Sequence, residues 1–83
     1  MLLNADSAPA LYAMALGDKA VGQTAAAVVH LEKAVALRPD WLKAHVQLAA
    51  LYIQLHRAAD GARERQLVDK LTEEQRTSGP GKD

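Results

Sequence analysis

The chain has 83 residues, of which ten are basic and ten are acidic, and its formal net charge is zero. This length suits one small domain with a marginal core, and the charge balance excludes a global field that would attract nucleic acid or an anionic membrane. Cysteine is absent, which excludes disulfides and thiolate metal sites.

The N-terminal segment MLLNADSAPA contains no basic region followed by an apolar stretch of signal-peptide length. No apolar run approaches the roughly 20 residues of a membrane-spanning helix. A cytoplasmic protein is therefore the expectation. Alanine dominates the composition, and because alanine and leucine are strong helix formers, the composition favours an all-α fold.

The first predicted helix begins at Ser7, whose hydroxyl can cap it, and Pro9 fits its first turn. Gly22 marks the end of this helix, because glycine weakens helices and favours the turn that follows them. Between these limits, apolar residues recur at helical spacing: Leu11, Met14, Ala15 and Val21.

The second predicted helix opens near Gln23 or Thr24 and ends before Pro39. Proline lacks an amide hydrogen, and it pushes the preceding Arg38 out of the α region. The apolar residues of this helix form one continuous stripe at offsets of three and four: Ala27, Val28, Leu31, Ala34, Val35 and Leu37.

Asp40 is predicted to cap the third helix, with Trp41 in its first turn. Exposed rings at Trp41 and Tyr52 could anchor a partner, but packing of both rings between helices is the favoured interpretation. The third helix repeats the apolar stripe with Leu48, Ala49, Tyr52 and Leu55.

A short polar turn is predicted over residues 56–60, and a fourth helix from about Ala58 to Gln75. Interleaved charges of both signs surround Leu67, Val68 and Leu71, which is typical of a solvent-facing helix with i,i+4 ion pairs. Residues 77–83 contain helix breakers and no apolar anchor, and they are expected to be disordered.

The chain matches itself when it is shifted so that Met14 meets Leu48, an interval that we name the repeat length. Small residues then meet small residues and large apolar residues meet large apolar ones, as in stacked helical hairpins. The other matched pairs are Ala15 with Ala49, Val21 with Leu55, Ala27 with Gly61, Ala34 with Val68, and Leu37 with Leu71.

This pattern resembles the tetratricopeptide repeat (TPR) family, and LEKAVALRPD is the stretch most similar to it. The resemblance implies an all-α fold of antiparallel helical hairpins stacked as a right-handed superhelix. The units would cover residues 8–41 and 42–76, and residues 1–7 would be the tail of a preceding unit or an N-terminal arm. Because Leu3, Leu37 and Leu71 share the repeat spacing, the chain is hypothesised to be the C-terminal piece of a longer array.

Some positions depart from the family pattern. Asp18 stands where an aromatic residue is usual, Arg65 replaces a bulky apolar residue, and Glu73 occupies the place of the closing proline. The last helix could therefore end the array, with its polar outer side acting as a cap.

The sequence contains few groups suited to catalysis or metal binding. The histidines His30, His45 and His56 are expected at the surface or its boundary. His45 and His56 are separated by roughly 16 Å along a helix, which is too far to share a metal. There is no glycine-rich phosphate loop and no recognisable nucleophile motif. Neither an enzyme nor a metal or cofactor site is expected.

By resemblance to the family, the first helix of each unit lines a concave face that binds other polypeptides. This face could hold an extended peptide or a partner helix, or its residues could simply pack against neighbouring units. No nucleic-acid or membrane partner is expected, nor a clamp for a peptide carboxylate. The predicted binding residues are Tyr12, Leu16, Lys19, Lys43, Gln47, Ala50 and Gln54, with Ala13, Val46 and Ile53 beside them.

The leading functional interpretation is a non-enzymatic module for protein–protein interaction. The alternatives are a structural C-terminal cap of a longer repeat array and an accessory segment of a larger enzyme. Because two units are few for a stable array, self-association through an exposed apolar edge is also expected. That edge is predicted near Leu11, Met14, Val28 and Leu31.

Overall fold

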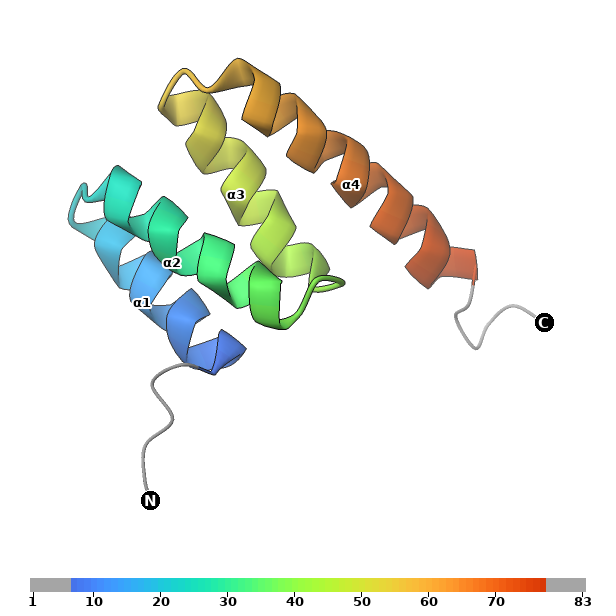
Figure 1. Cartoon of the computed structure of the whole chain (residues 1–83), viewed down its shortest axis with the longest axis horizontal. Helices are drawn as coiled ribbons and strands as arrows, with labels where there is room; N and C mark the ends of the chain where they lie inside the picture. Colours follow the sequence, from blue (N-terminus) through green and yellow to red (C-terminus); the bar gives the residue numbers. More distant parts are fainter. Residues whose placement is uncertain (1–6, 78–83) are drawn as a thin grey trace.

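Figure 1 shows the computed structural model, which describes residues 7–77. The predicted tail of a preceding unit (residues 1–7) and the predicted disordered C-terminus (residues 77–83) lie, apart from Ser7 and Thr77, outside the described range. Residues 7–77 contain no strand, and the all-α prediction is confirmed. They form helices α1 (Ala8–Ala20), α2 (Thr24–Leu37), α3 (Leu42–Gln54) and α4 (Ala58–Thr77).

The start of α1 follows the predicted capping chemistry. The Ser7 hydroxyl oxygen accepts a hydrogen bond from the backbone N–H of Ala10 at 3.2 Å, and Pro9 lies in the first turn. This bond satisfies one of the backbone donors that a helix start leaves without an intrahelical partner.

The turns that end α1 and α3 have the same backbone design. Gly22 has φ 83°, and His56 in the second turn has φ 62°. In the first turn the N–H of Gln23 donates to Asp18 O at 2.7 Å, and in the second the N–H of Arg57 donates to Tyr52 O at 2.8 Å. A left-handed residue therefore reverses the chain in both hairpins, but only the first turn uses glycine for it.

His56→Gly is expected to raise the free energy of unfolding by about 1 kcal/mol, because the left-handed conformation strains every residue with a Cβ. Gly22→Ala is expected to lower it by a similar amount. Urea unfolding monitored by circular dichroism measures both changes. A destabilised His56→Gly variant would show that the His56 side chain contributes more than its strained backbone costs.

The joint between α2 and α3 confirms the predicted break and corrects the predicted cap. Arg38 has φ −136° and ψ 82°, outside the α region. No side chain accepts a hydrogen bond from the first turn of α3, and Trp41, not Asp40, occupies the cap position. The cause is a turn in which the N–H of Trp41 donates to Arg38 O at 3.1 Å. This turn leaves Asp40 one residue before the place from which it could cap.

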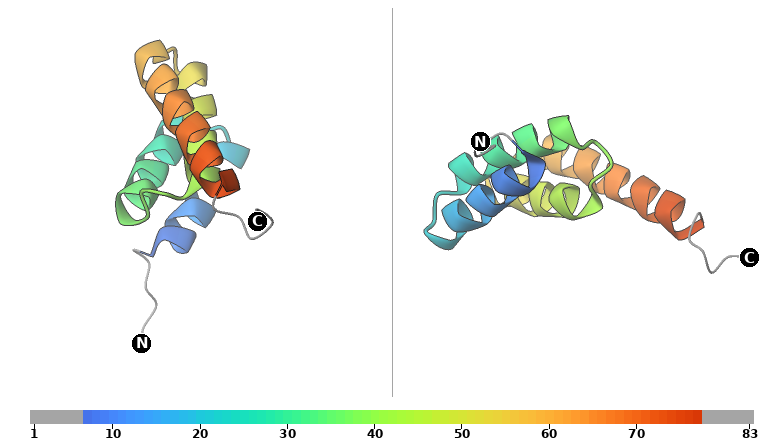
Figure 2. Two further views of the ribbon diagram at one scale, coloured as in Figure 1. Left: turned by 90° about the vertical axis from the view of Figure 1, so that its right-hand side faces the viewer. Right: turned by 90° about the horizontal axis from the view of Figure 1, so that it is seen from below.

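The helices pack in chain order, so that α2 contacts both α1 and α3, and α3 also contacts α4. In the right-hand view of Figure 2, α1 and α3 lie on one side of the molecule, with α2 above them. Fully buried alanines let the helices approach closely. The larger core cluster contains Ala15, Ala27, Val28, Leu31, Ala44, Leu48, Leu51 and Tyr52, and the smaller one contains Ala8, Leu11 and Ala34.

The predicted apolar edge is wrong at three of its four residues. Leu11, Val28 and Leu31 are buried in the two core clusters. Only Met14 of that set is exposed. Val21, one of the apolar residues at helical spacing in the first predicted helix, and Leu37, in the apolar stripe of the second, are exposed as well.

Helix α4 begins at Ala58 as predicted, but it continues to Thr77, the first residue of the predicted tail. Leu71 is buried, whereas Leu67 and Val68 are half-buried. Asp60 pairs with Arg57 and Arg63, each at 2.8 Å, so these ion pairs have three-residue rather than the predicted four-residue spacing. Among residues 7–77, no helix has both the length and the apolar character required to cross a membrane.

Candidate interaction surface

The residues predicted to bind a partner recur at helical spacing on α1 and α3, and we name the set the α1–α3 face: Tyr12, Leu16 and Lys19 of α1, with Lys43, Gln47, Ala50 and Gln54 of α3. Two contacts join its halves. The Lys19 ammonium donates to Gln47 Oε1 at 3.0 Å, and Lys43 Nζ lies 6.0 Å from the centre of the Tyr12 ring. Tyr12 and Gln47 are half-buried, and the other members of the face are exposed.

A stack of rings and cations stands at one end of the α1–α3 face. The Tyr12 and Trp41 rings are 4.9 Å apart between centroids, and the Arg38 guanidinium carbon lies 4.7 Å from the Trp41 centroid. Trp41 also packs against both core clusters, so the prediction that it packs between helices is confirmed. With Lys43 beside Tyr12, two cations flank two rings, an arrangement that stabilises both cations at the surface.

Two depressions flank Val46 on α3. The larger, of about 560 Å³, lies where α4 reaches the α2–α3 joint, and there the side-chain amide of Gln75 donates to Asp40 O at 3.2 Å. It is lined by Arg38, Asp40, Trp41, Leu42, Lys43, Val46, Gln47 and Gln75. The smaller, of about 340 Å³, is named the α3–α4 groove and is lined by Val46, Ala49, Ala50, Ile53, Arg65, Val68 and Asp69.

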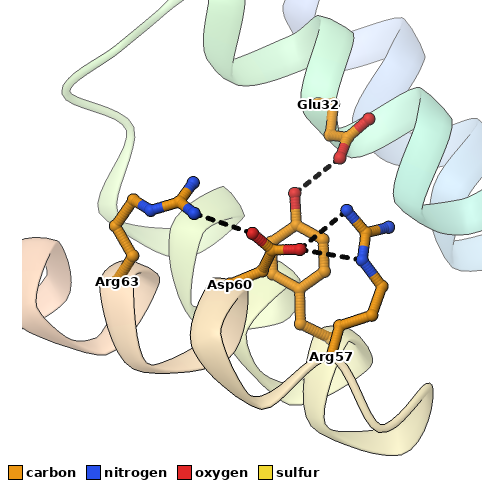
Figure 3. Close-up of polar contacts among 5 residues, drawn as sticks. Glu32, Arg57, Asp60 and Arg63 are labelled. Atoms are coloured by element: carbon orange, nitrogen blue, oxygen red, sulfur yellow. Dashed lines mark hydrogen bonds and ion pairs between the residues drawn. The ribbon is translucent and has the colours of Figure 1, made fainter.

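Tyr52 connects α3 to α2 and to the start of α4. Its hydroxyl donates to Glu32 Oε2 at 2.5 Å, and the Arg57 guanidinium carbon lies 4.6 Å from the centre of its ring. Arg57 in turn pairs with Asp60, which also receives Arg63, as Figure 3 shows. Burial of Tyr52 was predicted, but its partner Glu32, on the preceding helix, was not.

Burial and the hydrogen bond to Glu32 raise the pKa of Tyr52 above its ordinary value of 10.0. Above pH 10.0 an unfolded tyrosine loses its proton while the folded one keeps it, so the unfolded state binds fewer protons and stability falls as pH rises. As the pH rises from 10.0 to about 11, we expect Tyr52 to lower the free energy of unfolding by about 1 kcal/mol. Denaturant midpoints across this range should fall less steeply in Tyr52→Phe than in the wild type.

His45 corrects the prediction that the histidines lie at the surface or its boundary, because its side chain is only 4% exposed. Its Nδ1 lies 2.6 Å from Glu64 Oε1, and its Nε2 lies 2.7 Å from the backbone oxygen of Pro39. Both ring nitrogens of His45 face oxygen atoms, so each of the two contacts needs a proton on one of its atoms to be a hydrogen bond. His45 thus ties α3 to α4 and to the α2–α3 joint.

Asp18 and His30 connect α1 to α2, with the Asp18 Oδ2 and His30 Nδ1 atoms 2.6 Å apart. Each successive helix pair therefore contains one contact between a carboxylate and an aromatic ring group. Within residues 7–77, no three histidine, aspartate or glutamate side chains gather as a metal site requires. The contacts of these titratable groups join helices to one another.

Comparison with known proteins yields no protein-family model, no curated protein and no solved structure that matches the chain. The functional conclusion therefore depends on the geometry described above.

Proposed function

We propose that the chain is a non-enzymatic protein–protein interaction module of the TPR type, which binds a peptide or a partner helix on its α1–α3 face. The positions of the helices support the repeat. Helix α1 begins and ends one repeat length before α3 does, and α2 begins one repeat length before α4. A stack of equivalent hairpins is the arrangement that this regular interval favours, and a right-handed twist of the stack is what the resemblance to the TPR family implies.

The composition of the α1–α3 face carries the proposal. Leu16 is an exposed large apolar residue on this face, and Val46, which precedes Gln47 on α3 and lies outside the defined set, is also exposed. Lys19 and Lys43 are exposed beside them. Apolar side chains grouped with polar ones on an accessible surface are typical of sites that bind other proteins. The partner with the best fit is a segment whose apolar side chains cover Leu16 and Val46 and whose acidic side chains meet the two lysines.

A selection from a displayed peptide library, with the wild-type chain as bait, tests this proposal. We expect enriched peptides to combine apolar and acidic residues. Leu16→Glu should weaken their binding by about tenfold or more, and Lys43→Glu by about fivefold, because the first buries a charge and the second removes an attraction.

Lys33→Glu is the matched control, because Lys33 is an exposed lysine on α2, away from the α1–α3 face. It should leave the dissociation constant within about twofold of the wild type. Failure to enrich any peptide, or equal losses for Lys33→Glu and Lys43→Glu, would contradict binding at the α1–α3 face.

A further inference from the structure

The two hairpins differ in what covers their first helices. In α3, Leu48 is 1% exposed, packed in the larger core cluster that α2 shares. Its counterpart in α1, one repeat length earlier, is Met14, which is 44% exposed. The same difference in burial holds along the helix. Four residues of the first hairpin are exposed or half-buried: Ala10, Met14, Gly17 and Val21. Their counterparts are buried, except for the half-buried last one: Ala44, Leu48, Leu51 and Leu55. We name the first set the α1 stripe; its spacing places it on one side of the helix.

The second hairpin has the complementary surface. Ala15, Leu31 and Val35 of the first hairpin share the larger core cluster with Leu48 and Leu51 of α3. Their counterparts one repeat length later are Ala49, Arg65 and Asp69, and all three line the α3–α4 groove. The groove is therefore the place that a helix equivalent to α3 would occupy if another hairpin followed.

We propose that a second copy of this chain docks its α1 stripe in the α3–α4 groove of the first copy. The contact would repeat between molecules the packing that joins α2 and α3 within one molecule. Because the two surfaces differ, the contact is heterologous: each added copy leaves one stripe and one groove open, and association continues head to tail. This inference goes beyond the proposed function because it concerns a second copy of the chain; Met14 is not part of the α1–α3 face, whereas the groove shares Ala50 with that face.

Side-chain size and charge favour a second copy as the occupant. Within one molecule, Lys19 of the first hairpin bonds to Gln47 of α3. In the contact between copies, Ile53 of the groove takes the position of Lys19, and Ala13 of the second copy takes the position of Gln47. A polar contact is thus replaced by an apolar one between smaller groups. Ile53 is 51% exposed and so available to make it.

Charge at the groove sets the strength of the association. Arg65 stands at the position of Leu31, and Asp18 of the second copy would take the position of Tyr52, which shares the larger core cluster with Leu31. These opposite charges would lie near each other across the contact. Asp69 at the position of Val35 makes the groove less apolar than its counterpart. We therefore expect weak association that added salt reduces further.

Sedimentation velocity on the wild-type chain, over concentrations up to roughly 1 mM, tests the proposal in the range where weak contacts associate. The weight-average sedimentation coefficient should rise continuously past the value of a dimer. Met14→Glu and Ile53→Glu should each abolish the rise, because each places a charge in the contact. Val29→Glu is the matched control, since Val29 is 48% exposed on α2, outside both surfaces, and it should associate like the wild type.

Mixing the two inactive variants separates this arrangement from any symmetric one. Met14→Glu retains its groove and Ile53→Glu retains its stripe, so the mixture should form a one-to-one heterodimer that grows no further. A wild-type chain that remains monomeric throughout, or a closed dimer that the mixture fails to restore, would overturn the proposal. The monomeric result would instead favour a role for α4 as the end of an array.

Discussion

Leu48→Ala is expected to lower the free energy of unfolding by about 3 kcal/mol, the range for removing a buried leucine side chain from a packed core. Leu48 is 1% exposed and belongs to the cluster that joins α2 to α3. A chain of this size has only a few kcal/mol of stability in total. The variant should therefore lose most of its helical circular dichroism at about 37 °C or at low urea concentration.

Met14→Ala is the matched control, because Met14 is the α1 counterpart of Leu48 and is 44% exposed. It should cost less than about 1 kcal/mol when unfolding is measured at concentrations low enough to keep the chain monomeric. Equal losses for the two variants would mean that α1 is covered as α3 is, and would contradict the packing described here.

Glu64→Ala is expected to lower the free energy of unfolding by about 2 kcal/mol, because it leaves Nδ1 of buried His45 without a partner. The other ring nitrogen, Nε2, faces the backbone oxygen of Pro39, which can only accept a hydrogen bond. Nε2 must therefore carry the proton of a neutral ring, and Nδ1 is left as an acceptor without a donor. Chemical denaturation measures the loss directly.

Two further substitutions interpret that result. Glu64→Gln places a side-chain amide there, which can donate to Nδ1 of a neutral His45 ring, so this variant should lose less stability than Glu64→Ala. Gln66→Ala removes an exposed polar side chain from the same helix and should change stability by no more than about 0.5 kcal/mol. A Glu64→Ala variant as stable as Gln66→Ala would show that the buried contact contributes nothing.

Local chemistry explains how much of the fold the sequence predicts. Ser7, Gly22 and Pro39 act on the backbone within a few residues of themselves, and the structure confirms the helix ends that they predict. The cap at Asp40 was wrong because it depends on the exact path of one turn, in which Trp41 bonds to Arg38. His56 was not recognised as a left-handed residue, although the matching Gly22 was the signal that could have indicated it.

Burial of individual residues was harder to predict, since periodicity defines an apolar side of a helix but not the element that covers it. Leu11, Val28 and Leu31 were expected at an edge, yet the chain's own helices bury them. His45 was misplaced for a similar reason: its partner Glu64 is on the next helix, and no local pattern connects them.

The candidate site shows the same division. Its members were predicted from the resemblance to the TPR family, and two contacts connect those on α1 with those on α3. The contacts between them do not follow, because Lys19 with Gln47 and Lys43 with Tyr12 depend on how closely two helices approach. The α3–α4 groove was missed altogether. It becomes visible only when burial is compared between positions one repeat length apart.

Nuclear magnetic resonance mapping with a selected peptide tests the central claim most directly. Amide resonances of the ¹⁵N-labelled chain would be followed during titration with the peptide at a chain concentration that keeps it monomeric. The account predicts that the largest shift changes cluster on α1 and α3, at Leu16, Lys19, Lys43 and Gln47, with α2 little affected. Changes centred on α2, or spread evenly over the helices, would contradict it.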